Sequence, residues 1–178
     1  AGAGPAEDDD LPAGQPPGLE VTGGLHFDPT ASVINSDEAW MTLIYGTLVR
    51  PNADGGFDPW LAESVEVVDP TSIAVTLRDG LTFSDGTPYV AEAVKAGILR
   101  NLNQAVSPAV QAGRHALFKD LADITSEAPL ELTFVLNAPV AGEFISVLAG
   151  RESAVPSPKA IAEGKGTLLY AAYQTRLK

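Results

Sequence analysis

Hydrophobic and polar residues alternate along three of four short stretches of the chain that are predicted to be strands. The first two stretches, Glu63–Val68 and Ile73–Leu77, flank an Asp-Pro-Thr-Ser turn. The other two, Leu121–Ser126 and Leu130–Leu136, flank a Glu-Ala-Pro turn. Short connections of this kind join antiparallel neighbours. The pattern therefore predicts two hairpins that contribute to one antiparallel sheet.

Apolar residues at helical spacing predict helices between and after these hairpins. The clearest helix is expected over Ala91–Asn103, packed on one face of the sheet. Its apolar side would be formed by Val94, Ile98, Leu99 and Leu102. Weaker patterns predict a helix capped by Ser36 and Asp37 that runs through Leu48, and further helices over Ser107–Phe118, Pro139–Leu148 and Ser157–Glu163. Sheet and helices together predict an α+β fold with a mixed, mainly antiparallel sheet.

Glycine, proline and aspartate mark the connections. Pro51–Asp58 is expected to be a loop, and Asp79-Gly80 and Asp85-Gly86 are expected to be turns. Leu19–Leu25 is a short strand candidate. Ala1–Gly18 holds Gly, Pro, Ala and acidic residues with almost nothing to bury, which is typical of a flexible tether or a frayed terminus.

Composition narrows the class of function. The 178 residues are 45% hydrophobic and 19% charged, which is typical of a single globular domain. The formal net charge of −12 disfavours nucleic acid and anionic membrane surfaces as partners. Without cysteine the chain has no disulfides, thiol catalysis or cysteine zinc sites.

Motifs of enzymes and of cofactor binding are missing from the sequence. It contains no Gly-x-Ser-x-Gly elbow, no Gly-x-Gly-x-x-Gly loop and no phosphate loop ending in Gly-Lys-Ser or Gly-Lys-Thr. The two histidines, His26 and His115, are too far apart in sequence to suggest a metal-binding motif. We therefore expect no catalytic residues, cofactor or metal site.

Three stretches, read together, resemble a known family. They are Tyr45–Arg50 (YGTLVR), Pro59–Ser64 (PWLAES) and Leu77–Pro88 (LRDGLTFSDGTP). Their order and spacing resemble the family 5 extracellular solute-binding proteins, the oligopeptide-, dipeptide- and nickel-binding subunits of ABC importers. Leu132–Pro139 and Leu148–Ala160 are similar to later segments of that family, so the resemblance runs from about Leu19 to Tyr170.

The chain departs from the family pattern at several places. Val90 and Ala93 stand where the family has a helix-capping pair, a loss of about 1 kcal/mol. Gly166–Tyr170 carries Leu-Leu where the family has Gly-Pro, and the sequence ends at Lys178 where the family continues.

The resemblance implies a domain organisation. Residues 19–178 would form a partial first lobe of a class II periplasmic-binding-protein-like fold. Within it, residues 37–150 would be the small subdomain, and residues 19–36 and 151–178 would be pieces of the main subdomain.

The resemblance also implies a function. The chain would be part of the substrate-binding component of an ABC importer for peptides or similar small solutes, which it would deliver to the permease. Its place would be extracytoplasmic, in the periplasm or at the cell surface, with a lipid anchor as one option. The alternative is a surface protein on the same scaffold that no longer transports and acts through protein contacts.

Candidate ligand-binding residues follow from the same resemblance. Arg151 would lie at the return toward the hinge, where a guanidinium can bind a carboxylate in bidentate fashion; a salt bridge to Glu152 or Glu143 is the structural alternative. His26 and Asp28 lie in a loop that faces the cleft in the family, although an exposed histidine is the alternative there.

Two other features have competing interpretations. The aromatic residues Trp40, Trp60, Phe83 and Phe134 could line a cleft, but their spacing favours core packing. Asp85–Pro88 could hold a metal or phosphate, but it is more typical of a turn that leads into a helix.

Self-association through exposed strand edges is a further expectation. In the family, the first lobe is completed by later segments. Without these neighbours, Leu19–Leu25 and the stretch near Val155 should be disordered or pair with a second copy.

Overall fold

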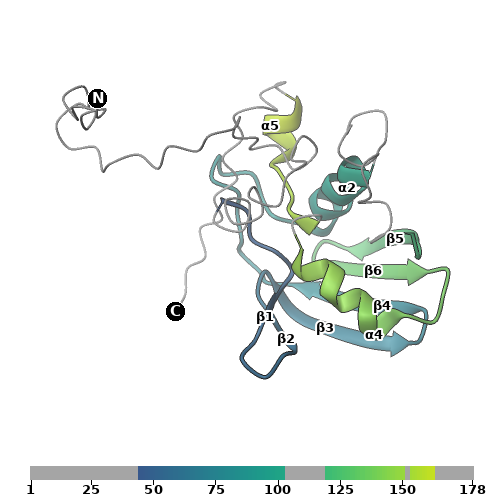
Figure 1. Cartoon of the computed structure of the whole chain (residues 1–178). Helices are drawn as coiled ribbons and strands as arrows, with labels where there is room; N and C mark the ends of the chain where they lie inside the picture. Colours follow the sequence, from purple (N-terminus) through teal and green to yellow (C-terminus); the bar gives the residue numbers. More distant parts are fainter. Residues whose placement is uncertain (1–43, 103–118, 151–152, 163–178) are drawn as a thin grey trace, which may run out of the picture.

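The computed structural model describes residues 44–102, 119–150 and 153–162 (Figure 1). Its centre is an antiparallel sheet of four strands in the order β3-β4-β6-β5. The strands are β3 (Ala62–Asp69), β4 (Ser72–Leu77), β5 (Leu121–Ala128) and β6 (Glu131–Leu136). The two predicted hairpins are confirmed, and they join through β4 and β6 in the middle of the sheet.

The alternation in the sequence becomes a buried and an open face of this sheet. Ile73 pairs with Phe134 and Val75 with Leu132 across the central strands, and all four side chains are buried. Between them, Ala74 pairs with Thr133 on the open face, where both are half-buried. Burying one face of a sheet fixes the register, because a slip of one residue would exchange the two faces.

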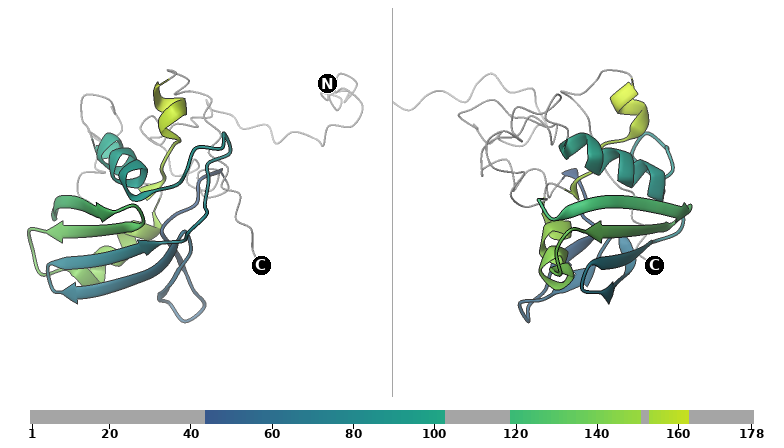
Figure 2. Two further views of the ribbon diagram at one scale, coloured as in Figure 1. Left: turned by 180° about the vertical axis from the view of Figure 1, so that it is seen from behind. Right: turned by 90° about the vertical axis from the view of Figure 1, so that its right-hand side faces the viewer.

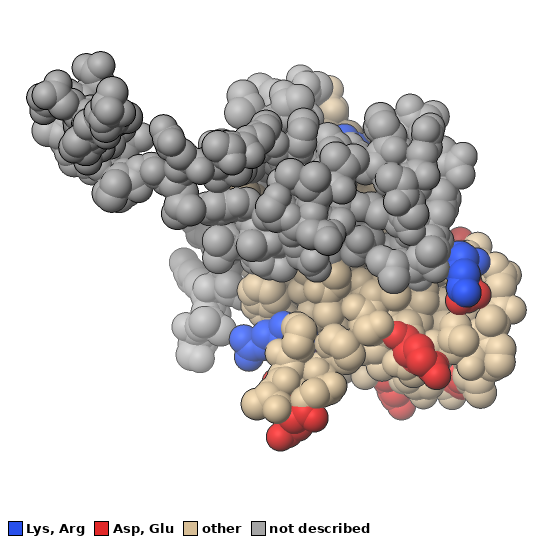
Figure 3. Space-filling model, viewed as in Figure 1, with Lys and Arg blue, Asp and Glu red and all other residues tan. Residues whose placement is uncertain are grey.

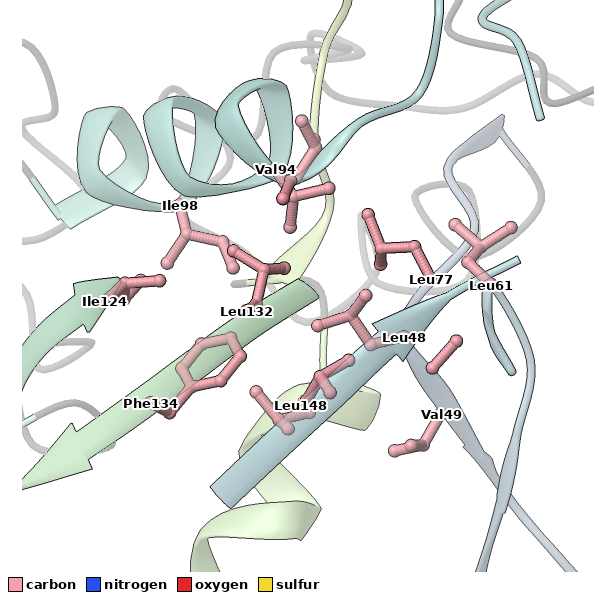
Figure 4. Packing of buried hydrophobic residues seen from close by; sticks show 14 of the residues in the cluster. Leu48, Val49, Leu61, Leu77, Val94, Ile98, Ile124, Leu132, Phe134 and Leu148 are labelled. Atoms are coloured by element: carbon pink, nitrogen blue, oxygen red, sulfur yellow. The ribbon is translucent and has the colours of Figure 1, made fainter. Parts of the chain in front are cut away.

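Helices cover the buried face. They are α2 (Ala91–Leu102), α4 (Ala141–Phe144) and the short 3-10 helix η2 (Ile145–Ala149). The last helix, α5 (Pro158–Ala162), has no buried residue and lies away from the sheet in Figure 1. Figure 4 shows Val94 and Ile98 of α2 pointing toward Ile124 and Leu132 of the sheet. The Phe144 ring of α4 lies 6.2 Å from the Phe134 ring, so both helical segments pack on the same side. The two further views in Figure 2 show the same layering.

The apolar face of α2 differs from the prediction at one position. Val94 and Ile98 are fully buried as expected, but Leu99 is 42% exposed and Asn101 is buried in its place. The helix is therefore rotated toward Asn101, whose amide donates a hydrogen bond to the Ala154 carbonyl oxygen over 2.7 Å. This hydrogen bond offsets part of the cost of burying the polar side chain.

Two predictions near the start of the described chain are wrong. Residues 51–58 are not a simple loop, because β1 (Val49–Pro51) and β2 (Phe57–Pro59) form a small antiparallel hairpin around its tip. The helix predicted through Leu48 does not reach that residue. Instead Leu48 accepts hydrogen bonds from the Trp60 and Ala62 amides over 2.9 and 3.1 Å, and this pairing overrides the helical spacing.

The predicted turns are confirmed. Gly80 and Gly86 have φ angles of 73° and 83°, a region that favours glycine over other residues. The expected helices over 139–148 and 157–163 correspond to α4 with η2 and to α5. The tether at 1–18, the strand at 19–25 and the helix at 107–118 lie outside the described residues. Among the helices of the described segments, none is long and apolar enough to cross a bilayer.

Candidate functional site

The segment Ser153–Ser157, here called the return segment, runs from η2 past α2 and is buried along its whole length. Val155 packs so closely on Gly97 of α2 that a Cβ atom at Gly97 would lie 2.4 Å from the Val155 Cγ1 atom. Val155 is 0% exposed. The expectation of an exposed edge near Val155 is therefore wrong, because α2 covers this segment.

Ser153 fixes the start of the return segment. Its amide donates to the Gly150 carbonyl oxygen over 3.1 Å, and its hydroxyl lies 2.8 Å from the carbonyl oxygens of Leu148 and Gly150. These bonds define the chain on both sides of positions 151 and 152. Arg151 itself, like His26 and Asp28, lies outside the described residues, so the three ligand-binding candidates stay predictions.

Asp85 ties the far end of the return segment to the turn before α2. Its carboxylate accepts a hydrogen bond from the Ser157 hydroxyl over 2.5 Å and another from the Thr87 amide over 2.9 Å. Burial raises the pKa of Asp85, but these hydrogen bonds and the charge of Lys159 outweigh it and hold the pKa below its ordinary value. The Asp85–Pro88 motif is thus a turn that leads into a helix, and its carboxylate is used as a tether.

The aromatic residues mostly belong to the core. Phe83 and Phe134 are buried, as the spacing favoured, and the Phe83 ring lies 5.3 Å from the Tyr89 ring in an edge-on arrangement. Trp60 is half-buried, and its carbonyl oxygen accepts a hydrogen bond from the Arg78 side chain over 2.7 Å. Trp40 lies outside the described residues.

The contacts that hold the return segment were not predicted from the sequence. Asp85 and Ser157 are 72 positions apart, and Asn101 and Ala154 are 53 apart, so no local pattern connects them. Asn101 gave no signal of its own, because α2 also carries the polar residues Glu92, Lys95 and Arg100.

Comparison with known proteins places this arrangement in a family. Residues 56–171 match the model of the bacterial extracellular solute-binding proteins, family 5. The chain is 38% identical over 102 residues to the glutathione-binding protein GsiB of Escherichia coli (strain K12). That match covers 57% of this chain and 19% of the relative, so the chain spans about a fifth of the relative's length.

Solved structures agree on the fold. A nickel ABC transporter protein from Bacillus halodurans is 29% identical with a TM-score of 0.59, over 76% of this chain and 26% of that one. The murein tripeptide binding protein MppA of Escherichia coli superposes with a TM-score of 0.71 at 21% identity, over 83% of this chain and 32% of that one. The predicted α+β fold of the periplasmic binding proteins is confirmed.

The matched region includes the whole four-stranded sheet, α2, η2 and the return segment. The chain belongs to the bacterial extracellular solute-binding proteins of family 5.

Proposed function

We propose that this chain is part of the substrate-binding component of an ABC importer for peptides or similar small solutes. The observation that carries the proposal is the 38% identity to a glutathione-binding protein over 102 residues. The nickel transporter protein and the murein tripeptide binding protein among the structural neighbours support the same general role. The family binds solutes without transforming them, and we propose that this chain is likewise a binder and not an enzyme.

The proposed domain organisation is a partial first lobe over residues 19–178. Residues 37–150 would form the small subdomain, and residues 19–36 and 151–178 would belong to the main subdomain, after a tether over residues 1–18. The match to about a fifth of a curated relative supports a partial lobe. In such proteins two lobes close over a ligand by bending at a hinge.

The proposed ligand contacts are Arg151, His26 and Asp28. A guanidinium binds a carboxylate with two parallel hydrogen bonds, which suits the terminus of a peptide. Support for Arg151 comes from the family match, which includes this position. A salt bridge to Glu152 or Glu143 would be the structural role for the same side chain.

The proposed location is extracytoplasmic, in the periplasm or at the cell surface, with a lipid anchor as one arrangement. The proposed macromolecular partner is the permease of the importer. The family description as extracellular supports the location.

A titration monitored by protein NMR tests the proposed function. Glutathione and short peptides added to the 178-residue chain should shift a localised set of amide signals in a saturable manner, with a dissociation constant of about 1 mM. Arg151→Ala should weaken this binding by about tenfold and leave the remaining spectrum unchanged.

The result that would overturn the proposal is the absence of any saturable shift at solute concentrations of about 10 mM. That outcome would favour a surface protein that acts through protein contacts alone. A loss of the native spectrum in the Arg151→Ala variant would instead show that Arg151 has a structural role.

A further inference from the structure

Strand β3 is an outer strand of the sheet with a free edge. It pairs with β4 on one side, and within the described segments no strand lies beyond it. Figure 1 shows β3 along the lower margin of the sheet. An outer strand presents backbone N–H and C=O groups that can pair with another extended segment. We refer to residues Glu63–Asp69 as the β3 edge.

Exposed apolar side chains gather on the β3 edge. Val67 is 42% exposed and Val68 is 61% exposed, and Val65 is half-buried. The opposite outer strand, β5, carries no large hydrophobic residue that is exposed to this degree, and α2 packs against it. The two edges of the sheet are therefore unlike, and only the β3 edge combines free backbone groups with exposed valines.

The charges of the β3 edge are all negative. Glu63, Glu66 and Asp69 lie on the strand, which contains no lysine or arginine. The Asp69 carboxylate accepts hydrogen bonds from Thr71 and Ser72 over distances of 2.6–2.7 Å. Glu63 and Glu66 are exposed and form no ion pair with any described residue. Figure 3 shows separate acidic side chains on the lower part of this face of the molecule, together with a few basic ones.

We propose that the β3 edge binds an extended segment of a partner protein in which lysine or arginine alternates with apolar residues. The segment would add to the sheet as a further strand, with backbone hydrogen bonds to β3, apolar contacts to Val67 and Val68, and basic side chains beside Glu63 and Glu66. A second copy of this chain fits poorly, because pairing β3 with itself would bring the three carboxylates of each copy together.

Three synthetic peptides test this proposal. The first is an eight-residue peptide in which valine and threonine alternate with lysine, matched to the length of β3. The second carries glutamate at each lysine position, and the third carries N-methyl groups on alternate backbone amides, which prevent strand addition. The lysine peptide should bind the full chain at least about tenfold more tightly than either of the others.

Two charge-reversal variants locate the binding. Glu66→Lys should weaken the lysine peptide by about tenfold and strengthen the glutamate peptide. Glu127→Lys, which reverses an exposed carboxylate on the opposite outer strand, should leave both affinities as they are. If the peptide bound at the proposed solute site, neither substitution would change its affinity. This difference separates the present test from the test of the importer function.

Several results would overturn the proposal. Equal binding of the N-methylated peptide would exclude strand addition, and equal effects of Glu66→Lys and Glu127→Lys would exclude the β3 edge. Light scattering that shows a dimer of the chain in solution would make a second copy the occupant in place of a basic segment.

Discussion

At the scale of single residues, the contact between Gly97 and Val155 sets how closely the return segment approaches α2. Gly97→Ala would normally stabilise a helix by about 1 kcal/mol. Here the new Cβ atom would meet Val155 at 2.4 Å. Val155 is fully buried and β-branched, so it has little room to move, and overpacking costs about 1–3 kcal/mol. We expect a net loss of about 1 kcal/mol in the free energy of unfolding, measured by urea denaturation.

Gly142 provides the matched control for this prediction. It lies in α4, and nothing would lie within 4 Å of a Cβ atom there. Gly142→Ala should therefore leave the stability unchanged or raise it by up to about 1 kcal/mol. A Gly97→Ala variant as stable as Gly142→Ala would show that the return segment does not pack on α2 as described.

Asp85 should make the stability depend on pH in the acid range. Hydrogen bonds from Ser157 and Thr87 hold its folded-state pKa below the ordinary value of 3.8. Because the folded pKa is lowered, the Asp85 carboxylate stabilises the fold fully at pH values above the ordinary pKa. This contribution is lost as the pH falls through the folded pKa. Between about pH 5 and 2, the free energy of unfolding should fall less steeply with decreasing pH in Asp85→Asn than in the wild type.

Ser157→Ala checks the same bond from the other side. Removal of the hydroxyl donor should raise the folded pKa of Asp85 toward its ordinary value. As in Asp85→Asn, the free energy of unfolding should then fall less steeply as the pH decreases. If both variants keep the wild-type slope, the tether between Asp85 and Ser157 does not form in solution.

At the scale of elements, α2 is held to the sheet by its buried face. Ile98 is fully buried over Ile124 and Leu132 (Figure 4), whereas the next residue, Leu99, is 42% exposed. Ile98→Ala should lower the free energy of unfolding by about 2–5 kcal/mol, and Leu99→Ala by about 0.5 kcal/mol or less. Comparable losses in the two variants would mean that the helix presents a different face to the sheet.

The elements that follow a strict period were predictable from the sequence. Both main hairpins and α2 have runs in which the period of 2 or 3.6 persists over at least one complete strand or several turns. The hairpin β1–β2 was missed because each of its strands has three residues, which is too short for a period. The helical spacing near Leu48 was misleading because backbone pairing to Trp60 and Ala62 decided the local structure.

The face of α2 shows a second limit of prediction from sequence. Leu99 is more hydrophobic than Asn101, so hydrophobicity alone places Leu99 inside and Asn101 outside. The structure does the reverse because the Ala154 carbonyl oxygen accepts a hydrogen bond from the Asn101 amide. A partner 53 positions away in sequence cannot be inferred from the helix itself.

At the scale of the whole molecule, family and fold were predictable while the ligand contacts stay predictions. The motifs over Tyr45–Arg50, Pro59–Ser64 and Leu77–Pro88 fall on β1, on the start of β3 and on the turn before α2, positions that fix the chain path. Arg151, His26 and Asp28 were inferred from the resemblance alone and lie outside the described residues.

The central claim is that the chain is a partial lobe of a solute-binding protein. Its most direct test is the dissociation constant of the 178-residue chain for small solutes. A cleft that closes between two lobes buries most of its ligand, and a single lobe offers only one of the two walls. Since the entropy cost of association does not fall in proportion, the proposed partial lobe should bind glutathione and short peptides with a dissociation constant of about 1 mM, near −4 kcal/mol. Isothermal titration calorimetry that finds micromolar binding would contradict this account, because it would show a complete binding site within these 178 residues.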